Sequence, residues 1–154
     1  MQTGDISTTR NYINDFATEQ GVSFVYGSSQ RLVAKTRSKL TYPIIHMNRP
    51  MIRTRDNGMA NRLATFYLEI TIIEKYETKG SIEDEDASEW AAEQAALEMM
   101  MELLKKMNHD NSEGLLNFDF KTVTIDPVMD KWIDKHTGWK MSFRLDGGIN
   151  SKVC

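Results

Sequence analysis

The stretch Arg62-Leu-Ala-Thr-Phe-Tyr-Leu-Glu-Ile-Thr-Ile-Ile-Glu-Lys75 decides the fold class of this 154-residue chain. Two sets of side chains alternate along it. The apolar set is Ala64, Phe66, Leu68, Ile70 and Ile72, and the more polar set is Thr65, Tyr67, Glu69 and Thr71. Because successive side chains of a strand point to opposite faces, the alternation predicts one long strand with a buried face and a more solvent-exposed face.

A second alternation lies near the end of the printed sequence. There, Trp139, Met141, Phe143 and Leu145 alternate with Lys140, Ser142, Arg144 and Asp146. This pattern predicts a closing strand. Residues 147–154 begin with two glycines and are expected to form a flexible tail.

Between the two strands, residues 84–108 have the pattern of a long helix. Residues 83–86 are all acidic, and Lys105 and Lys106 lie near the other end, which is the arrangement that the helix dipole favours. The predicted apolar stripe consists of Ala87, Trp90, Ala91, Gln94, Leu97, Met101 and Leu104, widened by Ala95, Met100 and Met107. We expect this stripe to pack on the sheet, so that one core contains Phe66, Leu68, Ile70, Trp139, Met141, Phe143 and Trp90.

Two shorter features complete the predicted elements. Residues 7–20 indicate a short helix that ends at Gly21, with one apolar face made of Tyr12, Ile13, Phe16 and Ala17. The apolar parity slips by one residue between Phe120 and Val123, which predicts a β-bulge.

Together these elements predict an α+β fold: a mostly antiparallel, twisted sheet packed against one long helix and a short N-terminal helix. The length indicates a single domain over residues 1–154. Residues 27–60 are expected to form a long basic loop or hairpin, in which 31–40 is either a basic strand edge or a loop. Residues 51–55, inside this segment, and residues 62–76, after it, are expected to pair as strands around the turn residues 56–58.

Composition excludes several classes of protein. The formal net charge of -3 indicates no strong preference for a polyanion or a polycation. A single cysteine, Cys154, cannot form an internal disulfide and suggests a reducing, cytosolic origin. No stretch approaches the roughly 20 apolar residues that span a bilayer, so we expect no membrane partner. The first residues lack a signal-peptide pattern.

No group of residues predicts catalysis, and we expect neither an enzyme nor a bound metal or cofactor. His46, His109 and His136 lie on separate segments without the spacing of a zinc site. The acidic run 83–89 lacks the central glycine of a calcium loop and suits a helix start better. Phosphate-binding glycine motifs are absent, and Ser28, Ser29 and Ser142 have no visible base partner.

The basic stretch 31–55 is the candidate interaction surface. It contains no acidic residue between its ends, and its cations are Arg31, Lys35, Arg37, Lys39, Arg49, Arg53 and Arg55. Three interpretations stay open: an assembly surface that meets the acidic run 83–89 of a neighbour, a nucleic-acid face, or a solvated face. The complementary charges of the two segments favour assembly over nucleic acid.

The order of elements resembles that of tail-terminator and tail-completion proteins of tailed bacteriophages. The resemblance is carried by the strand at 63–73, the arginine-rich segment 49–55, the helix at 84–107, and the ending Gly138-Trp-Lys-Met-Ser-Phe-Arg-Leu with Cys154. It implies a non-enzymatic ring subunit at the neck or tail of a virion, assembled in the host bacterial cytoplasm. The implied partners are other copies of the chain and the virion proteins on the portal and tail sides. The alternative is a small nucleic-acid-binding α+β module that uses residues 31–55.

Overall fold

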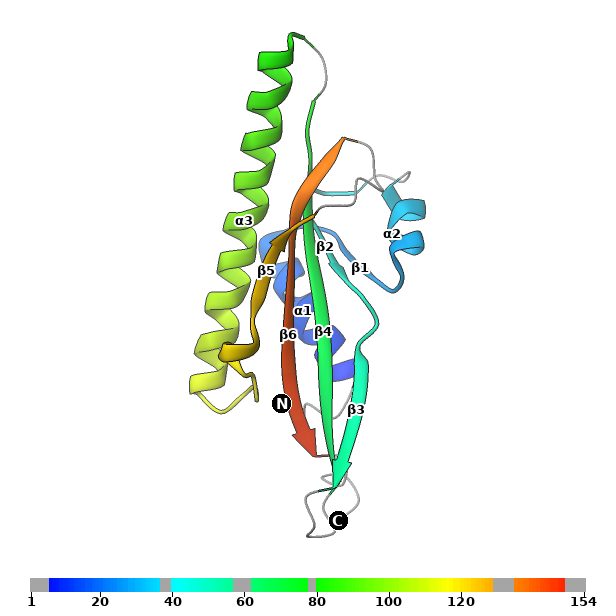
Figure 1. The fold of residues 1–154 in the computed structure, drawn as a ribbon, viewed down its shortest axis with the longest axis vertical. Coiled ribbons are helices and arrows are strands. Elements are labelled where there is room, and N and C mark those ends of the chain that lie inside the picture. Colours follow the sequence, from blue (N-terminus) through cyan, green and yellow to red (C-terminus); the bar gives the residue numbers. More distant parts are fainter. Residues whose placement is uncertain (1–5, 37–39, 57–61, 78–79, 129–134, 149–154) are drawn as a thin grey trace.

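The computed structural model of the chain describes residues 6–36, 40–56, 62–77, 80–128 and 135–148 (Figure 1). Its elements, in chain order, are α1 (Ile6–Gln20), β1 (Phe24–Tyr26), α2 (Ser29–Thr36), β2 (Ile44–Met47), β3 (Met51–Asp56), β4 (Arg62–Lys75), α3 (Ile82–Ser112), the 3-10 turn η1 (Phe120–Thr122), β5 (Thr124–Pro127) and β6 (His136–Gly148). Within the described ranges, none of the helices combines the length and hydropathy that crossing a bilayer requires.

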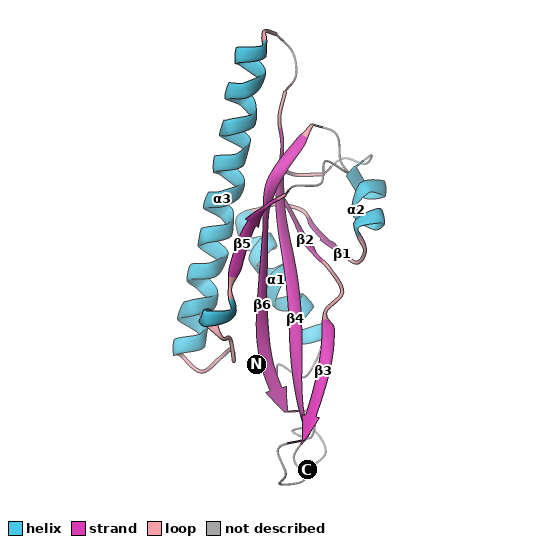
Figure 2. Ribbon diagram, in the orientation of Figure 1, coloured by secondary structure: helices cyan, strands magenta, loops and turns pink. Residues whose placement is uncertain are grey.

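The strands form one mixed sheet, with helices on both of its faces (Figure 2). The strand order is β1-β2-β4-β6-β5, and β3 pairs with β4 on the same edge as β2. Among the described strand pairs, β1 and β2 are parallel and the others are antiparallel. The predicted α+β class, with a mostly antiparallel sheet, a long helix and a short N-terminal helix, is confirmed.

The centre of the sheet is the antiparallel pair of β4 and β6. It runs without interruption from Leu63 opposite Gly148 to Lys75 opposite His136. Both predicted long strands are therefore present. β6 also includes the two glycines at 147 and 148, so the strand continues into the segment expected to be a tail. Residues 149–154 lie outside the described part.

Gly138 allows these two strands to approach closely near one end of the pair. It is buried and lies opposite Ile73. A Cβ atom built on Gly138 would lie 2.0 Å from the carbonyl oxygen of Ile72. Because that oxygen belongs to the backbone of β4, no side-chain movement would relieve the contact, and the position requires glycine.

One face of the sheet is covered by α1 and α3, which share the main core (Figure 1). From the sheet, Phe66, Leu68, Ile70, Met141 and Phe143 are buried there as predicted, and Trp139 packs against them half-buried. The face of α1 is also as predicted, with Ile13, Phe16 and Ala17 buried.

The buried face of α3 differs from the predicted one. Its buried residues are Ala92, Ala96, Met100, Leu103, Met107 and Asp110. Of the predicted stripe, Trp90 is 66% exposed and Met101 is 44% exposed, so placing Trp90 in the core was wrong. Ser81 and Asp84 cap the N-terminus of α3. They form a capping box, in which each side chain accepts a hydrogen bond from the other residue's backbone N–H.

The described residues cover the opposite face of the sheet only in part. Leu32 of α2 packs with Val25, Ile44 and Ile73 in a small second core. Residues 29–36 form this helix, whereas 31–40 was expected to be a basic strand edge or a loop. The segment 27–60 contains α2, β2 and β3. Of these elements, β3 forms the predicted antiparallel pair with β4, which follows the segment.

The expected bulge near residue 120 is also replaced by another structure. Phe118 makes an isolated bridge to Leu145, and the 3-10 turn η1 then separates it from β5. The side chain of Asp119 accepts a hydrogen bond from the backbone N–H of Lys121 at the start of this turn. The change in which alternate residues are apolar is thus produced by a turn. Two short segments, the bridge at Phe118 and β5, pair with β6 where one bulged strand was expected.

Replacing Phe66 or Phe143 by alanine should lower the free energy of unfolding by about 3–5 kcal/mol, because each substitution leaves a cavity in the core. Trp90→Ala should change it by no more than about 0.5 kcal/mol, because the indole is mostly in solvent. Urea denaturation followed by circular dichroism measures all three values. A loss for Trp90→Ala as large as that for Phe143→Ala would contradict the observed face of α3.

Gly138→Ala should destabilise the chain by at least about 1–3 kcal/mol, because the new methyl group forces the backbones of β4 and β6 apart. Lys140→Ala, two residues further along β6, is a matched control and should stay within about 0.5 kcal/mol. Thermal melting of both variants compares them. Equal melting temperatures would show that the strands are not in close contact at Gly138.

Candidate assembly surfaces

The structure divides the predicted basic surface into two groups. Arg31 and Lys35 lie exposed on α2, whereas Arg49 and Arg53 lie exposed further along the same edge of β4, before and within β3. Arg55 is in β3 opposite Leu63, but its side chain is outside the described part, as are Arg37 and Lys39. The predicted surface is therefore carried by a helix and a strand. Of its described cations, Arg49 and Arg53 lie beside the part of the sheet that α2 does not cover.

A register shift between β2 and β3 sets which side chains face this uncovered part. Met47 lies opposite Ile70, but Met51 lies opposite Tyr67, so three residues at 48–50 span two residues of β4. The amide of Asn48 still donates to the carbonyl of Glu69, and Pro50 has no N–H to continue the ladder. One extra residue moves the side chains of the rest of this segment to the opposite faces of the sheet. Met51 and Arg53 consequently share the face of Tyr67, away from α1 and α3.

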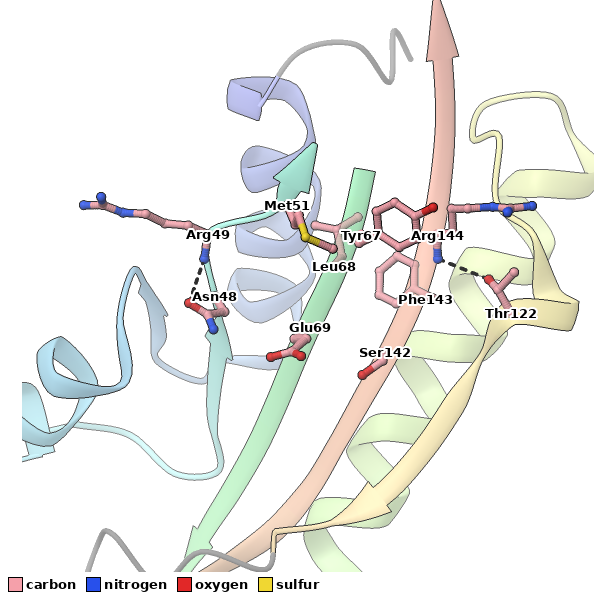
Figure 3. A pocket seen from close by; sticks show the side chains of 10 residues that line it. All are labelled: Asn48, Arg49, Met51, Tyr67, Leu68, Glu69, Thr122, Ser142, Phe143 and Arg144. Carbon is pink, nitrogen blue, oxygen red and sulfur yellow. Dashed lines mark hydrogen bonds between the residues drawn. The ribbon is translucent and has the colours of Figure 1, made fainter. Parts of the chain in front are cut away.

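A shallow hollow of about 500 Å³ lies on this face, at the register shift. Its lining residues are Asn48, Arg49, Met51, Tyr67, Leu68, Glu69, Thr122, Ser142, Phe143 and Arg144. Figure 3 shows Tyr67 between Met51 and Arg144, while the side chains of Arg49 and Arg144 extend outward on opposite sides. We name this region the open-face hollow. It combines an aromatic ring and a methionine with arginines at its rim.

The arginines around the open-face hollow are held in different ways. The guanidinium carbon of Arg53 lies 5.4 Å from the ring centroid of Tyr67, a cation–π contact. Nη2 of Arg144 donates to a carboxylate oxygen of Asp119 at 2.8 Å, which partly neutralises it. Glu69 is the carboxylate that lines the hollow. Arg49 and Arg53 are thus the exposed cations that a neighbouring carboxylate would meet first.

His46, which falls within the basic stretch, does not belong to the exposed surface. It is buried in β2, and its Nε2 lies 2.7 Å from the carbonyl oxygen of Gly27. Burial lowers the pKa of its imidazole below the usual value, although the hydrogen bond to Gly27 opposes this effect. A neutral ring that bridges β2 and the turn before α2 has a structural role.

A second candidate surface lies on α3 and comes from the stripe that was predicted to be core. Trp90, Leu97 and Met101 follow one another by seven and then four residues, so they lie on one side of the helix. Leu97 is half-buried, and the other two are exposed. We name these three residues the outer stripe. A groove of about 560 Å³, which includes Pro43 and Met99, adjoins it.

Acidic residues surround the outer stripe. Between Ile82 and Leu104, α3 contains no lysine or arginine, and its acids are Glu83, Asp84, Glu85, Asp86, Glu89, Glu93, Glu98 and Glu102. Glu98 and Glu102 are exposed on the two turns that also carry Leu97 and Met101. The side-chain amide of Gln94 donates to Glu98 at 3.1 Å. This surface is therefore apolar at its centre and anionic at its rim.

The other two histidines lie on separate elements. His109 is exposed near the end of α3, and His136 at the start of β6 lies 2.7 Å from the hydroxyl of Tyr42. Within the described ranges, no three histidine, cysteine, aspartate or glutamate side chains converge as a metal site would need.

The chain was also compared with known proteins. No family model, no curated protein and no solved structure matches it significantly.

Proposed function

We propose that this chain is a non-enzymatic structural subunit that associates head to tail into a closed ring, and that the ring joins the portal side to the tail of a bacteriophage. One observation carries the proposal. The outer stripe of α3 and the open-face hollow have opposite charge at their rims, have apolar centres, and lie on opposite sides of the sheet. Different complementary patches on two sides of one chain are what a head-to-tail assembly requires.

Placement of the two surfaces supports repeated association. The side chains of Tyr67, Met51 and Arg53 face away from the helices that cover the main core, and α3 lies on the covered face. A contact between the hollow of one copy and α3 of the next leaves a free surface of each kind at the two ends. Further copies then add until the rotation between neighbours closes a ring.

The neck or tail location rests on the resemblance in element order. The long strand, the long helix and the closing strand on which the resemblance depends correspond to β4, α3 and β6. The arginine-rich segment corresponds to β3 and the residues before it. In this proposal the ring contacts virion proteins on the portal side and on the tail side.

Nucleic-acid binding is the second candidate, because one feature of the open-face hollow favours it. Tyr67 stands on an uncovered sheet face with an arginine over its ring and two more arginines nearby. Aromatic rings and arginines on an open sheet are used to bind single-stranded nucleic acid. Against this, Glu69 lines the hollow, and Asp119 already pairs with Arg144.

The double variant Arg49→Glu/Arg53→Glu should remain folded but lose assembly, because its new carboxylates would face the acids of a neighbouring α3. Light scattering after size-exclusion chromatography, over a concentration series, measures the mass of the wild type and of the variant. The control is Lys75→Glu, which makes the same kind of charge change at the far end of β4.

Three outcomes are distinguishable in this experiment. A wild-type chain that stays monomeric at every concentration contradicts the ring. Assembly that survives both arginine reversals removes these residues from the interface. Loss of binding to single-stranded DNA in a salt series, with assembly intact, would replace the ring by the nucleic-acid module.

A further inference from the structure

We propose that the outer stripe of α3 docks in the open-face hollow of a second copy of this chain, with Trp90 and Met101 as its apolar anchors. This inference rests on the proposed head-to-tail assembly and names the two surfaces that meet. The sequence suggested that the arginines meet the acidic run 83–89 of a neighbour. In the proposed contact they meet a longer stretch of α3, which includes the outer stripe.

The shape of α3 makes it suitable as the inserted element. Trp90 and Met101 are eleven residues apart, which corresponds to about 16 Å along a helix. Between them, Leu97 continues the same apolar line. Isolated exposed apolar residues are common on protein surfaces. Here they are aligned in one row, and tryptophan and methionine are residue types enriched at protein interfaces.

The open-face hollow offers the matching chemistry. Met51 is 53% exposed and lies opposite Tyr67 on β4, so an apolar floor is already formed in the single copy. Arg49 and Arg53 are at the rim, and an arginine can pair with a carboxylate through two parallel hydrogen bonds. An apolar centre with a cationic rim complements an apolar centre with an anionic rim.

Charge also disfavours the simplest alternative, in which two copies of α3 pair with each other. The first cation along the helix after Ile82 is Lys105, near the far end. Whether parallel or antiparallel, two outer stripes placed face to face would bring acids such as Glu98 and Glu102 near acids of the partner helix. Like charges across an interface are destabilising. Contact with a different, arginine-bearing surface avoids this repulsion.

The inference predicts complementation between two variants that cannot assemble alone. Trp90→Glu/Met101→Glu blocks the helix surface but leaves the hollow intact, and Arg49→Glu/Arg53→Glu does the reverse. Each variant alone should be monomeric. An equimolar mixture should form a one-to-one heterodimer and nothing larger, because only one intact pair of surfaces remains. Native mass spectrometry of full-length chains of different isotopic mass identifies this species.

Two additional measurements make the test specific. Circular dichroism and thermal melting establish that each variant is folded, and the exposure of Trp90 and Met101 makes their replacement tolerable. Ile82→Glu is the matched control, because Ile82 is an exposed apolar residue of α3 that lies off the outer stripe. It should assemble as the wild type does. If Trp90→Glu/Met101→Glu does not fold, Trp90→Ala takes its place and should weaken self-association about 30-fold or more.

The outcomes separate this inference from the function on which it rests. A one-to-one heterodimer in the mixture supports the docking of α3 in the hollow. Two monomeric variants that do not associate when mixed overturn the docking, because their surfaces are then not partners. Wild-type assembly that is insensitive to Trp90→Glu/Met101→Glu also overturns it and leaves the ring standing. A wild-type chain that never assembles overturns both.

Discussion

The antiparallel pair of β4 and β6 is the constraint on which the rest of the structure depends. Its thirteen matched residue pairs fix which side chains of both strands lie toward α1 and α3 and which lie on the other face. A slip of either strand by one residue would reverse the facing of every side chain on that strand, moving Phe66 of β4 or Phe143 of β6 out of the core. The close contact at Gly138 helps to hold that register, since a side chain there would collide with the backbone of β4. The other described strands and the helices α1, α2 and α3 are arranged around this pair.

The two faces of the sheet are packed differently, and the register of β4 and β6 decides which side chains lie on each. The face under α1 and α3 carries the main core, and α2 covers only one end of the other face. The register shift at residues 48–50 then turns Met51 and Arg53 toward the uncovered part. A hollow with an apolar floor and a basic rim is the result. The proposed assembly needs no catalytic group, because the interaction energy would come from burying Trp90, Met101 and Met51 and from pairing arginines with carboxylates.

The two apolar sides of α3 show how stability and assembly can share one helix. Ala92 and Ala96 are small, so the helix backbone approaches the sheet closely, and Met100, Leu103 and Met107 fill the core further along. A tryptophan at the position of Ala92 would hold the helix away from the sheet. Trp90 therefore remains outside, where its large apolar surface is available to another chain. Such exposure lowers solubility unless charges surround it, and the acids of α3 supply those charges.

The sequence by itself determined the α+β class, the strands β4 and β6, the extent of α1 and the existence of α3, because their periodic patterns are long. It also singled out Arg49 and Arg53, which lie beside the hollow, but not Arg144, which lines it. Only the tertiary structure decided which stripe of α3 is buried, because two apolar stripes of equal period lie about a third of a turn apart and periodicity cannot rank them. The helix at 29–36 is eight residues long with Leu32 as its buried anchor, so packing against β1 and β2 decides its formation. The register shift at 48–50 depends on pairing between segments far apart in the chain, which no local pattern encodes.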